Sequence, residues 1–272
     1  MEMCDVLLFG TMSDIGQTVE ASLAAHGLTV VAVGFPQNTF RDSSGYRREL
    51  FKTLEAVHPK MIMPVGDTLA LSILKEEIPS GIAVPVDAPD KIRLLSSKTG
   101  TYALARELGI SQPALMTAQD LAAGRRVIYK REVSFGGSGV HKPRSVEALA
   151  NLIAHENGTP YLIEEYIEGS DISVDCIRTE GSFRAGCYIS LAREYTQGPS
   201  VGRRIVECPE AVETASTLLS HLDFRGICGL DFRLTEDGRL YFLECNPRFT
   251  GGLATQLASG FDLPYLLYTA GI

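Results

Sequence analysis

Short apolar runs alternate with amphipathic stretches over the first 90 residues of the chain. Runs of about four to six apolar residues are typical of buried strands, and apolar positions three or four residues apart are typical of helices. The pattern predicts strands at 6–9, 28–33, 61–64 and 83–86, and helices at 15–26, 50–57 and 69–78. Short strands that alternate with helices predict parallel strands joined by crossover helices.

The expected N-terminal unit is a small Rossmann-like α/β lobe, which we place at residues 1–88. Its first turn keeps Gly10 and Gly16 but lacks the G-x-G-x-x-G spacing that lets a backbone approach a pyrophosphate. The second strand ends in Val33, Gly34 and Phe35, without the acidic residue that would bind an adenosine ribose. These two departures disfavour a dinucleotide-dependent reductase.

The pattern changes after Ala88, where long strands joined by tight turns replace the alternation of strand and helix. It predicts helices at 92–108, 146–155 and 209–222, and strands at 127–131, 161–166, 172–179, 183–191, 228–234 and 240–245. The expected fold class is therefore α/β followed by α+β.

Composition narrows the classes of function. The 272 residues are 45% hydrophobic, which suffices for a substantial core, and a formal charge of −8 disfavours a nucleic-acid partner, which needs a basic surface. The six cysteines form no CxxC pair, so we expect buried thiols and neither a zinc site nor a disulfide framework. The N-terminus is acidic where a signal peptide is basic, and no apolar run approaches about 18 residues, so we expect a cytoplasmic protein without membrane contact.

The last predicted hairpin carries the strongest signal for chemistry. Asp237 followed by Gly238 favours a two-residue type I′ turn, which places Glu236 opposite Arg239. The register that follows pairs Asp231 with Glu244, Gly229 with Asn246, and Arg233 with Phe242. One face is then apolar, and it consists of Leu230, Phe232, Leu234, Tyr241, Leu243 and Cys245.

The opposite face of this hairpin carries Asp231, Glu244 and Asn246. Two carboxylates directly across a strand pair repel each other by up to about 1 kcal/mol, so we expect a cation between them. Three oxygen-bearing side chains at this spacing suit a hard Mg²⁺ or Mn²⁺ ion that keeps water and phosphate oxygens as its other ligands. The alternative is a solvated acidic face without a metal.

A glycine-rich turn follows the predicted strand 127–131. Successive backbone N–H groups in such a turn can face an anion, and Lys130 at the end of the strand adds a positive charge. The segment is therefore a candidate cover for nucleotide phosphates, and an ordinary loop is the alternative. It is not a Walker A loop, because no Gly-Lys-Ser/Thr follows the glycines.

Taken in order, these pieces resemble the ATP-grasp superfamily, most closely the branch of carbamoyl-phosphate-synthase-like proteins and amino-acid ligases. The resemblance rests on the lysine helix that begins near Lys98, the loop from Leu108 to Pro113, the glycine-rich turn, the hinge 162–171, and the E-x-N-P-R motif that ends at Arg248. It implies a two-lobed ATP-grasp domain at residues 89–272, with a lid at about 114–168 and a metal-binding C-terminal lobe at about 169–272.

The resemblance also implies roles for single residues. The metal ligands would be Asp231, Glu244 and Asn246. The residues implied in ATP binding are Lys98 and Lys130 for the phosphates, Ser134, Gly136, Gly137, Ser138 and Gly139 for the lid, Glu164, Glu165, Tyr166 and Ile167 for adenine, and Asp171 for the ribose. One departure from the family pattern is Ser97, which stands where an aspartate is usual.

The implied activity is that of an ADP-forming carboxylate–amine ligase, in which ATP converts an acid of an amino acid or small metabolite into an acyl phosphate. Arg248 would hold the transferred phosphoryl group, while Arg193, and Arg203 or Arg204, are candidates to bind a substrate carboxylate. The alternative for these last arginines is a solvated position on a loop. His141 follows the lid, but a lone loop histidine is usually incidental.

Two other functions stay open at this point. One is a bicarbonate-activating, carboxylase-like ATP-grasp enzyme, and the other is a non-catalytic ATP-binding regulatory subunit. The sequence ends at Ile272, soon after the metal motif, which leaves the substrate side open or completed by a partner. The expected partners are a small-molecule carboxylate and an amine, together with a second copy of the chain or a partner subunit.

Overall fold

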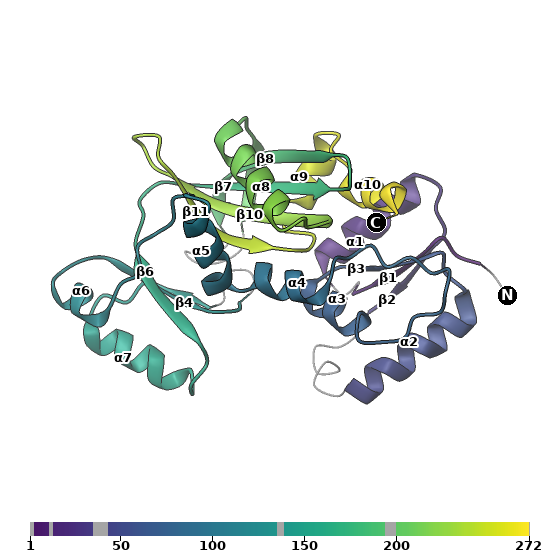
Figure 1. Cartoon of the computed structure of the whole chain (residues 1–272), viewed down its shortest axis with the longest axis horizontal. Coiled ribbons are helices and arrows are strands. Elements are labelled where there is room, and N and C mark those ends of the chain that lie inside the picture. Colours follow the sequence, from purple (N-terminus) through teal and green to yellow (C-terminus); the bar gives the residue numbers. More distant parts are fainter. Residues whose placement is uncertain (1–2, 11–12, 35–42, 135–138, 194–199, 272) are drawn as a thin grey trace.

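A computed structural model describes residues 3–10, 13–34, 43–134, 139–193 and 200–271. Three sheets organise this part of the chain, with strand orders β2-β1-β3, β5-β4-β6 and β11-β10-β7-β8-β9. In Figure 1 the first sheet lies at one end of the molecule, the second at the other end, and the five-stranded sheet between and above them. The fold is therefore mixed α/β.

The first sheet is parallel. Strand β1 (Val6–Phe9) pairs with β2 (Val30–Val33) and β3 (Met61–Pro64), and the helices are α1 (Asp14–Ala25), α2 (Ser43–Val57) and α3 (Asp67–Ile73). This confirms the prediction of parallel strands separated by helices. The strand predicted at 83–86 is wrong, because only an isolated bridge joins Ala83 to Met61. Pro85 follows at once and has no N–H with which to continue a ladder.

The helix predicted at 92–108 is two helices, α4 (Pro89–Ser96) and α5 (Lys98–Glu107), so the prediction of one helix is wrong. Ser97 between them has extended backbone angles, φ −93° and ψ 121°, and its Oγ accepts a hydrogen bond from Gly100 N at 2.9 Å. A serine hydroxyl in this position satisfies an N–H that a continuous helix would bond internally. Ser97 thus begins a new helix and places Lys98 at its first position.

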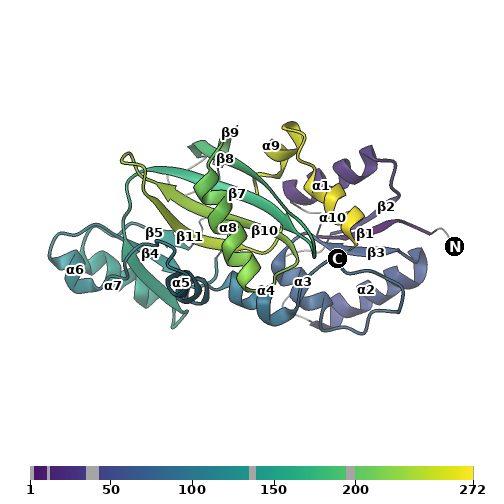
Figure 2. The same ribbon diagram turned by 45° about the horizontal axis from the view of Figure 1, so that its top comes forward.

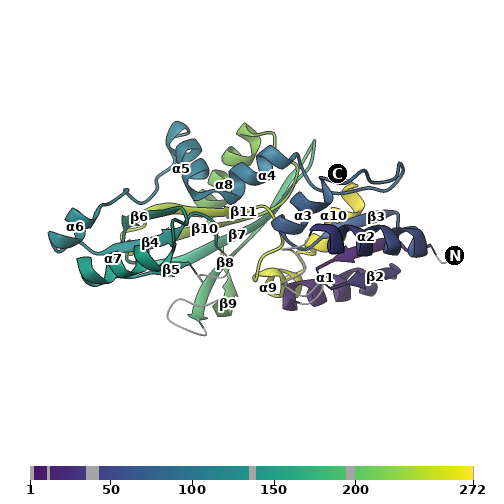
Figure 3. The same cartoon turned by 90° about the horizontal axis from the view of Figure 1, so that it is seen from below.

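The second sheet is a small antiparallel unit at the far end of the molecule. It contains β4 (Val127–Arg131) between β5 (Val140–His141) and β6 (Tyr161–Glu165), with the helices α6 (Ala118–Ala122) and α7 (Val146–His155) alongside. Figures 1 and 3 show these two helices beside the strands at the end opposite the N-terminus.

The five-stranded sheet is antiparallel and central. Its strands are β7 (Ser170–Arg178), β8 (Phe183–Arg193), β9 (Ser200–Ile205), β10 (Gly226–Leu234) and β11 (Leu240–Asn246). Helix α8 (Pro209–His221) lies across it in Figure 2 and packs on β7 and β8, while α5 packs on β11. These helices bury the apolar face of the sheet, so its other face is free to carry polar side chains.

A cluster of buried apolar side chains joins the first sheet and its helices to the five-stranded sheet. It combines Val6 and Leu23 with Ile177 on β7, and with Phe249, Leu253, Leu263 and Leu267 around α9 (Leu253–Ala258) and α10 (Leu263–Ala270). The six cysteines are free, and all except Cys208 are buried, which confirms that they act as small apolar side chains. No helix in the described ranges is both long enough and apolar enough to span a bilayer.

The predicted type I′ turn between β10 and β11 is wrong. Gly238 N donates to Thr235 O at 3.0 Å and Thr235 N to Arg239 O at 2.9 Å, so the loop has three residues, 236–238. Gly238 has a φ of +83°, which glycine adopts without strain. The longer loop places Thr235, and not Glu236, opposite Arg239.

The pairing of the two carboxylates is nevertheless the predicted one. Asp231 faces Glu244 and Gly229 faces Asn246, because the register shifts between Asp231 and Phe232. The shift leaves Leu243 without a partner in β10, as in a β-bulge, and offsets the extra loop residue.

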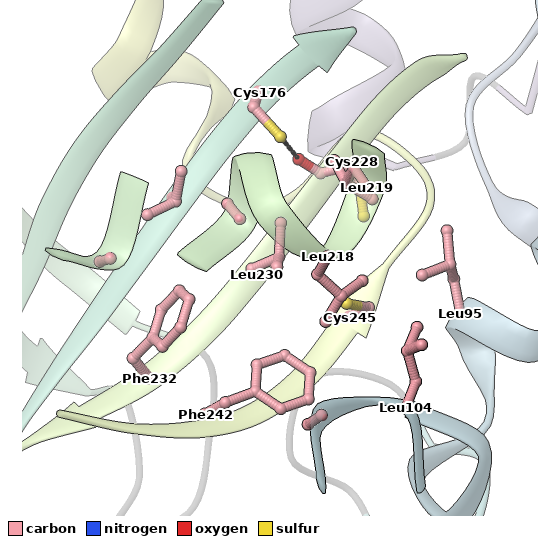
Figure 4. Close-up of a cluster of buried hydrophobic side chains, with 14 of the residues drawn as sticks. Leu95, Leu104, Cys176, Leu218, Leu219, Cys228, Leu230, Phe232, Phe242 and Cys245 are labelled. Atoms are coloured by element: carbon pink, nitrogen blue, oxygen red, sulfur yellow. Dashed lines mark hydrogen bonds between the residues drawn. The ribbon is translucent and has the colours of Figure 1, made fainter. Parts of the chain in front are cut away.

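The bulge changes which side chains enter the core. Phe242 faces Phe232, where Arg233 was predicted, and its ring lies 5.9 Å from Phe232 and 6.2 Å from Tyr102. Tyr241 is only half-buried, and Leu243 lines the cavity on the other face. The predicted places of Tyr241 and Leu243 on the apolar face are therefore wrong, whereas Figure 4 shows Phe242 in the core beside Phe232 and Cys245.

Two alanine substitutions test this register. Phe242→Ala should lower the free energy of unfolding by about 3–5 kcal/mol, because it empties a fully buried site. Tyr241→Ala should cost about 1 kcal/mol or less, since its ring is half exposed. Urea denaturation of both variants measures the difference, and equal losses would contradict the bulge.

Candidate active site

A cavity of about 920 Å³ opens on the polar face of the five-stranded sheet and is lined by this sheet, by the second sheet, and by residues that follow β1 and β3. Of the residues predicted for the site, those that line it are Lys130, Glu164, Glu165, Tyr166, Ile167, Asp171, Arg203, Asp231, Glu244, Asn246 and Arg248. The structure thus brings together residues that are more than 100 positions apart in the sequence.

Glu244 has a lysine beside it. The Nζ of Lys98 lies 3.1 Å from Glu244 Oε2, and the Lys98 side chain is only 4% exposed. Loss of water around Glu244 would raise its pKa, but the charges of Lys98 and then Lys130 outweigh this effect and hold the pKa below its usual value. Glu244 therefore carries its charge, and Lys98 is a cation at the acidic pair.

Among the residues that the structure describes, no cation forms an ion pair with Asp231. Ser173 Oγ donates to its Oδ1 at 2.5 Å and Asn246 Nδ2 to its Oδ2 at 3.3 Å. Burial and the neighbouring charge of Glu244 raise the pKa of Asp231 to about 7. The carboxylate form of Asp231 is thus disfavoured until a positive charge reaches the cavity.

These residues fit a divalent cation. Asp231 and Glu244 present carboxylate oxygens from one wall, and an added cation would remove the repulsion that raises the pKa of Asp231. Asn246 is adjacent, although its Oδ1 accepts a hydrogen bond from Arg248 Nη2 at 2.8 Å. Within the described ranges no three His, Cys, Asp or Glu side chains form a metal-binding group, so water and substrate oxygens would complete the coordination.

A second buried ion pair lies on the opposite wall. Lys130 Nζ and Glu164 Oε1 are 2.5 Å apart, with the two side chains 8% and 3% exposed. The hydroxyl of Tyr102 donates to Glu164 Oε2 at 2.6 Å. Lysine is seldom buried unless it is paired, so Glu164 fixes the ammonium of Lys130 at the cavity.

The predicted hinge and lid are only partly described. The ring centre of Tyr166 lies 3.8 Å from the guanidinium carbon of Arg126 and 4.7 Å from the Nζ of Lys142. Asp171 forms an ion pair with Arg233, with 2.8 Å between Oδ1 and Nη1. Ser134 Oγ lies 3.4 Å from Lys98 Nζ, and Gly139 is buried. Gly136, Gly137 and Ser138 lie outside the described residues.

The predicted arginines have different positions. Arg248 Nε lies 3.9 Å from Oδ1 of Asp67, which begins α3 in the N-terminal lobe. Arg203 lines the cavity, whereas Arg204 is exposed and does not. The backbone of Arg193 ends β8, and its side chain lies outside the described part of the structure. His141 is not among the lining residues and contacts Tyr129.

Asp67, Ser173 and Tyr102 are among the polar residues in and around the site that were not predicted. Asp67 follows β3, and the carboxyl ends of parallel strands are the usual place for functional side chains, so this signal was available. Ser173 is two positions after Asp171 in β7 and therefore shares its face. Tyr102 gave no such signal, because its contact with Glu164 joins residues 62 positions apart.

Part of the sequence matches a family of known proteins, and a curated relative covers most of the chain. Residues 157–270 match the sequence model of a family described as ATP-grasp in the biosynthetic pathway with Ter operon. The carbamoyl phosphate synthase large chain of Thermoanaerobacter pseudethanolicus is 23% identical over 248 residues, covering 78% of this chain and 23% of that protein. The chain thus spans about a quarter of that curated relative's length.

Solved structures share the fold along the whole chain. The biotin carboxylase domain of Hydrogenobacter thermophilus 2-oxoglutarate carboxylase, solved with MgADP and bicarbonate, has a TM-score of 0.74 at 17% identity and covers 100% of this chain and 70% of its own. D-alanyl-alanine synthetase A from Vibrio cholerae has a TM-score of 0.73 at 14% identity, and the match covers 100% of this chain and 98% of that protein's chain. The chain therefore has the fold of these proteins, and its residues 157–270 resemble the ATP-grasp family in sequence.

The raised pKa of Asp231 predicts a pH effect on stability. Between pH about 4 and 7 the folded protein keeps a proton on Asp231 that the unfolded chain releases, so this group's contribution to stability falls as pH rises through that window. Asp231→Asn removes the effect. In metal-free buffer at pH 7.5 the variant should be more stable than the wild type by about 1–2 kcal/mol, with the gain absent at pH 4.

Urea denaturation at the two pH values measures this difference. A variant that is less stable than the wild type at both values would contradict the assignment of the raised pKa.

Proposed function

We propose that the chain is an ATP-dependent, ADP-forming carboxylate–amine ligase that makes an amide or peptide bond through an acyl phosphate. The observation that supports this proposal most strongly is the opposed pair Asp231 and Glu244, which lies in a cavity that also contains Lys130 and Arg248. Carboxylates for a metal and cations for phosphates on facing walls are what phosphoryl transfer requires, since it depends on positioning and charge.

The nucleotide would lie between the second sheet and the five-stranded sheet. In this proposal the hinge residues Glu164, Glu165, Tyr166 and Ile167 offer main-chain groups to adenine, and Asp171 binds the ribose. Lys98 and Lys130 are held at the cavity by Glu244 and Glu164, where they would neutralise phosphate oxygens. Ser134, Gly139 and the segment between them would cover the phosphates.

Mg²⁺ or Mn²⁺ is the expected metal, held by Asp231, Glu244 and Asn246, and it would supply positive charge to the transferring phosphoryl group. The protein positions the reacting groups around it. Arg248 donates to Asn246 and lies near Asp67, so its planar fork is fixed at the metal-binding residues. There it would bind the phosphoryl group and then the acyl phosphate during attack by the amine.

The N-terminal lobe would complete the substrate side. We assign residues 1–88 to a Rossmann-like domain and residues 89–272 to the ATP-grasp domain, with the lid at about 114–168. Support comes from Gly10, Ser13 and Asp67, which line the cavity from the N-terminal lobe. Closure around the substrates would exclude the water that hydrolyses an acyl phosphate.

A bicarbonate-activating enzyme is the second candidate. The likeness to a biotin carboxylase domain solved with bicarbonate favours it. It differs from the ligase in a measurable way, because bicarbonate alone would then support ADP release, without an amine.

Glu244→Ala tests the proposal. Purified protein should release ADP from Mg-ATP only with one acid and one amine from a panel of amino-acid pairs. The variant should lower kcat by about 100-fold or more, because a carboxylate at the metal is lost. It should also abolish the effect of Mg²⁺ on ATP affinity, measured by calorimetry.

Glu236→Ala is the matched control, since Glu236 is exposed on the loop of the same hairpin. It should behave as the wild type. ATP binding that is insensitive to Mg²⁺ in the wild type, or a Glu244→Ala variant with full turnover, would contradict the proposal.

A further inference from the structure

Arg203 stands apart from the other charged groups of the cavity. It lies on β9, the edge strand of the five-stranded sheet, where it is paired with Ser190 of β8. Figure 3 shows this edge next to α9. Its guanidinium carbon lies 5.9 Å from the ring centre of Tyr188, and both residues line the cavity.

The charge of Arg203 has no partner in direct contact among the described residues. The two other arginines that line the cavity have carboxylates nearby, Asp171 for Arg233 and Asp67 for Arg248. The Nε of Arg203 is buried and makes no hydrogen bond within the described part of the chain. A half-buried guanidinium without an acceptor is unfavourable, so it favours binding of an anion.

Asp175 is the carboxylate that Arg203 influences from a distance. The charge of Arg203 lowers the pKa of Asp175, but burial is the larger effect and raises that pKa to about 6. Asp175 accepts hydrogen bonds from Thr250 at 2.7 Å and Gln256 at 3.5 Å. No ion pair joins Asp175 to Arg203 in the described part of the chain, so Arg203 keeps its capacity to bind another anion.

Two glycines make room for Arg203 and Tyr188. A Cβ on Gly251 would lie 3.1 Å from Arg203 Nη2. A Cβ on Gly252 would lie within van der Waals overlap of the Tyr188 ring. The loop after Arg248 passes over the Tyr188 ring only because Gly252 carries no Cβ, and a Cβ on Gly251 would push the end of the Arg203 side chain aside by a few tenths of an ångström.

The position of Arg203 sets the length of a ligand that could reach it. Asp231 pairs with Ser173, and Ser173 pairs with Tyr188, so Tyr188 lies two strands from the acidic pair. Strands are about 4.8 Å apart, so the backbones of Tyr188 and Asp231 are about 10 Å apart, and Arg203 lies on the next strand beyond Tyr188. Bicarbonate is too small to span this distance. A dicarboxylic acid can span it, and so can an amino acid that lies next to the reacting carboxyl group.

We propose that Arg203, with Tyr188 and the backbone at Gly251, forms a carboxylate subsite for a group that does not react. One substrate is then an α-amino acid that attacks through its amine, or a dicarboxylic acid. This inference rests on the proposed ligase function, because it uses the acidic pair as the reacting end of the cavity. Of the two neighbouring arginines that the sequence offered for a substrate carboxylate, the cavity thus favours Arg203 over the exposed Arg204.

Binding measurements test the subsite without turnover. The probes are the twenty L-amino acids and linear dicarboxylic acids, each compared with its carboxamide, in the presence of Mg²⁺ and a non-hydrolysable ATP analogue. Calorimetry should find an acid that binds the wild type about tenfold or more tightly than its amide, since a charge-assisted pair contributes that much. Arg203→Met should lose this preference.

Arg204→Met is the matched control, because Arg204 is the next residue on the same strand and is exposed. It should bind the acid as the wild type does. Gly251→Ala provides a second test that keeps the arginine. This variant should weaken binding of the acid and leave binding of the amide unchanged, since the new Cβ displaces the guanidinium.

The outcomes separate the subsite from the activity. Equal binding of the acid by Arg203→Met and the wild type would overturn the subsite, as would a panel in which no acid exceeds its amide. A tenfold loss of ATP-analogue affinity in Arg203→Met would show a phosphate site instead and also overturn it. Selective acid binding together with no ADP release would contradict the ligase and leave the carboxylate subsite in place.

Discussion

The repulsion between Asp231 and Glu244 is the constraint on which the rest of the site depends. The two carboxylates are directly opposed in β10 and β11, where like charges destabilise a strand pair. Lys98 compensates Glu244, whereas the described residues give Asp231 only hydrogen bonds from Ser173 and Asn246. Lys98 thus compensates one of the two charges, and the cation proposed above would compensate the other, which would link the stability of this sheet face to its chemistry.

Two local irregularities make this arrangement possible. The break at Ser97 begins a new helix, so Lys98 projects from its first position towards Glu244. The bulge at Leu243 turns Phe242 into the core and keeps Glu244 opposite Asp231 despite a three-residue loop. Regular structure at either point would separate the lysine from its carboxylate or turn a charged side chain into the core.

The cavity also needs distant parts of the chain. Asp67 reaches Arg248 from the N-terminal lobe, Glu164 fixes Lys130 in the second sheet, and Arg203 extends the polar wall along the edge of the central sheet. Each of these contacts joins residues far apart in sequence. The shared core around Phe249 and Leu253 holds the lobe that carries Asp67 against the five-stranded sheet.

The sequence by itself determined the parallel first sheet and the antiparallel hairpins, because periodicity and turn residues act between neighbours. The facing of Asp231 and Glu244 was predicted from a turn that is wrong, and it holds only because the bulge at Leu243 offsets the extra loop residue. The sequence did not reveal the bulge, since the alternation of β11 fits either placement of Tyr241 and Phe242 until Tyr102 packs against one of them. The partners of the charged side chains, Lys98 with Glu244 and Lys130 with Glu164, were decided by the tertiary structure alone. Such contacts depend on how the sheets and helices pack, and a local pattern carries no information about that packing.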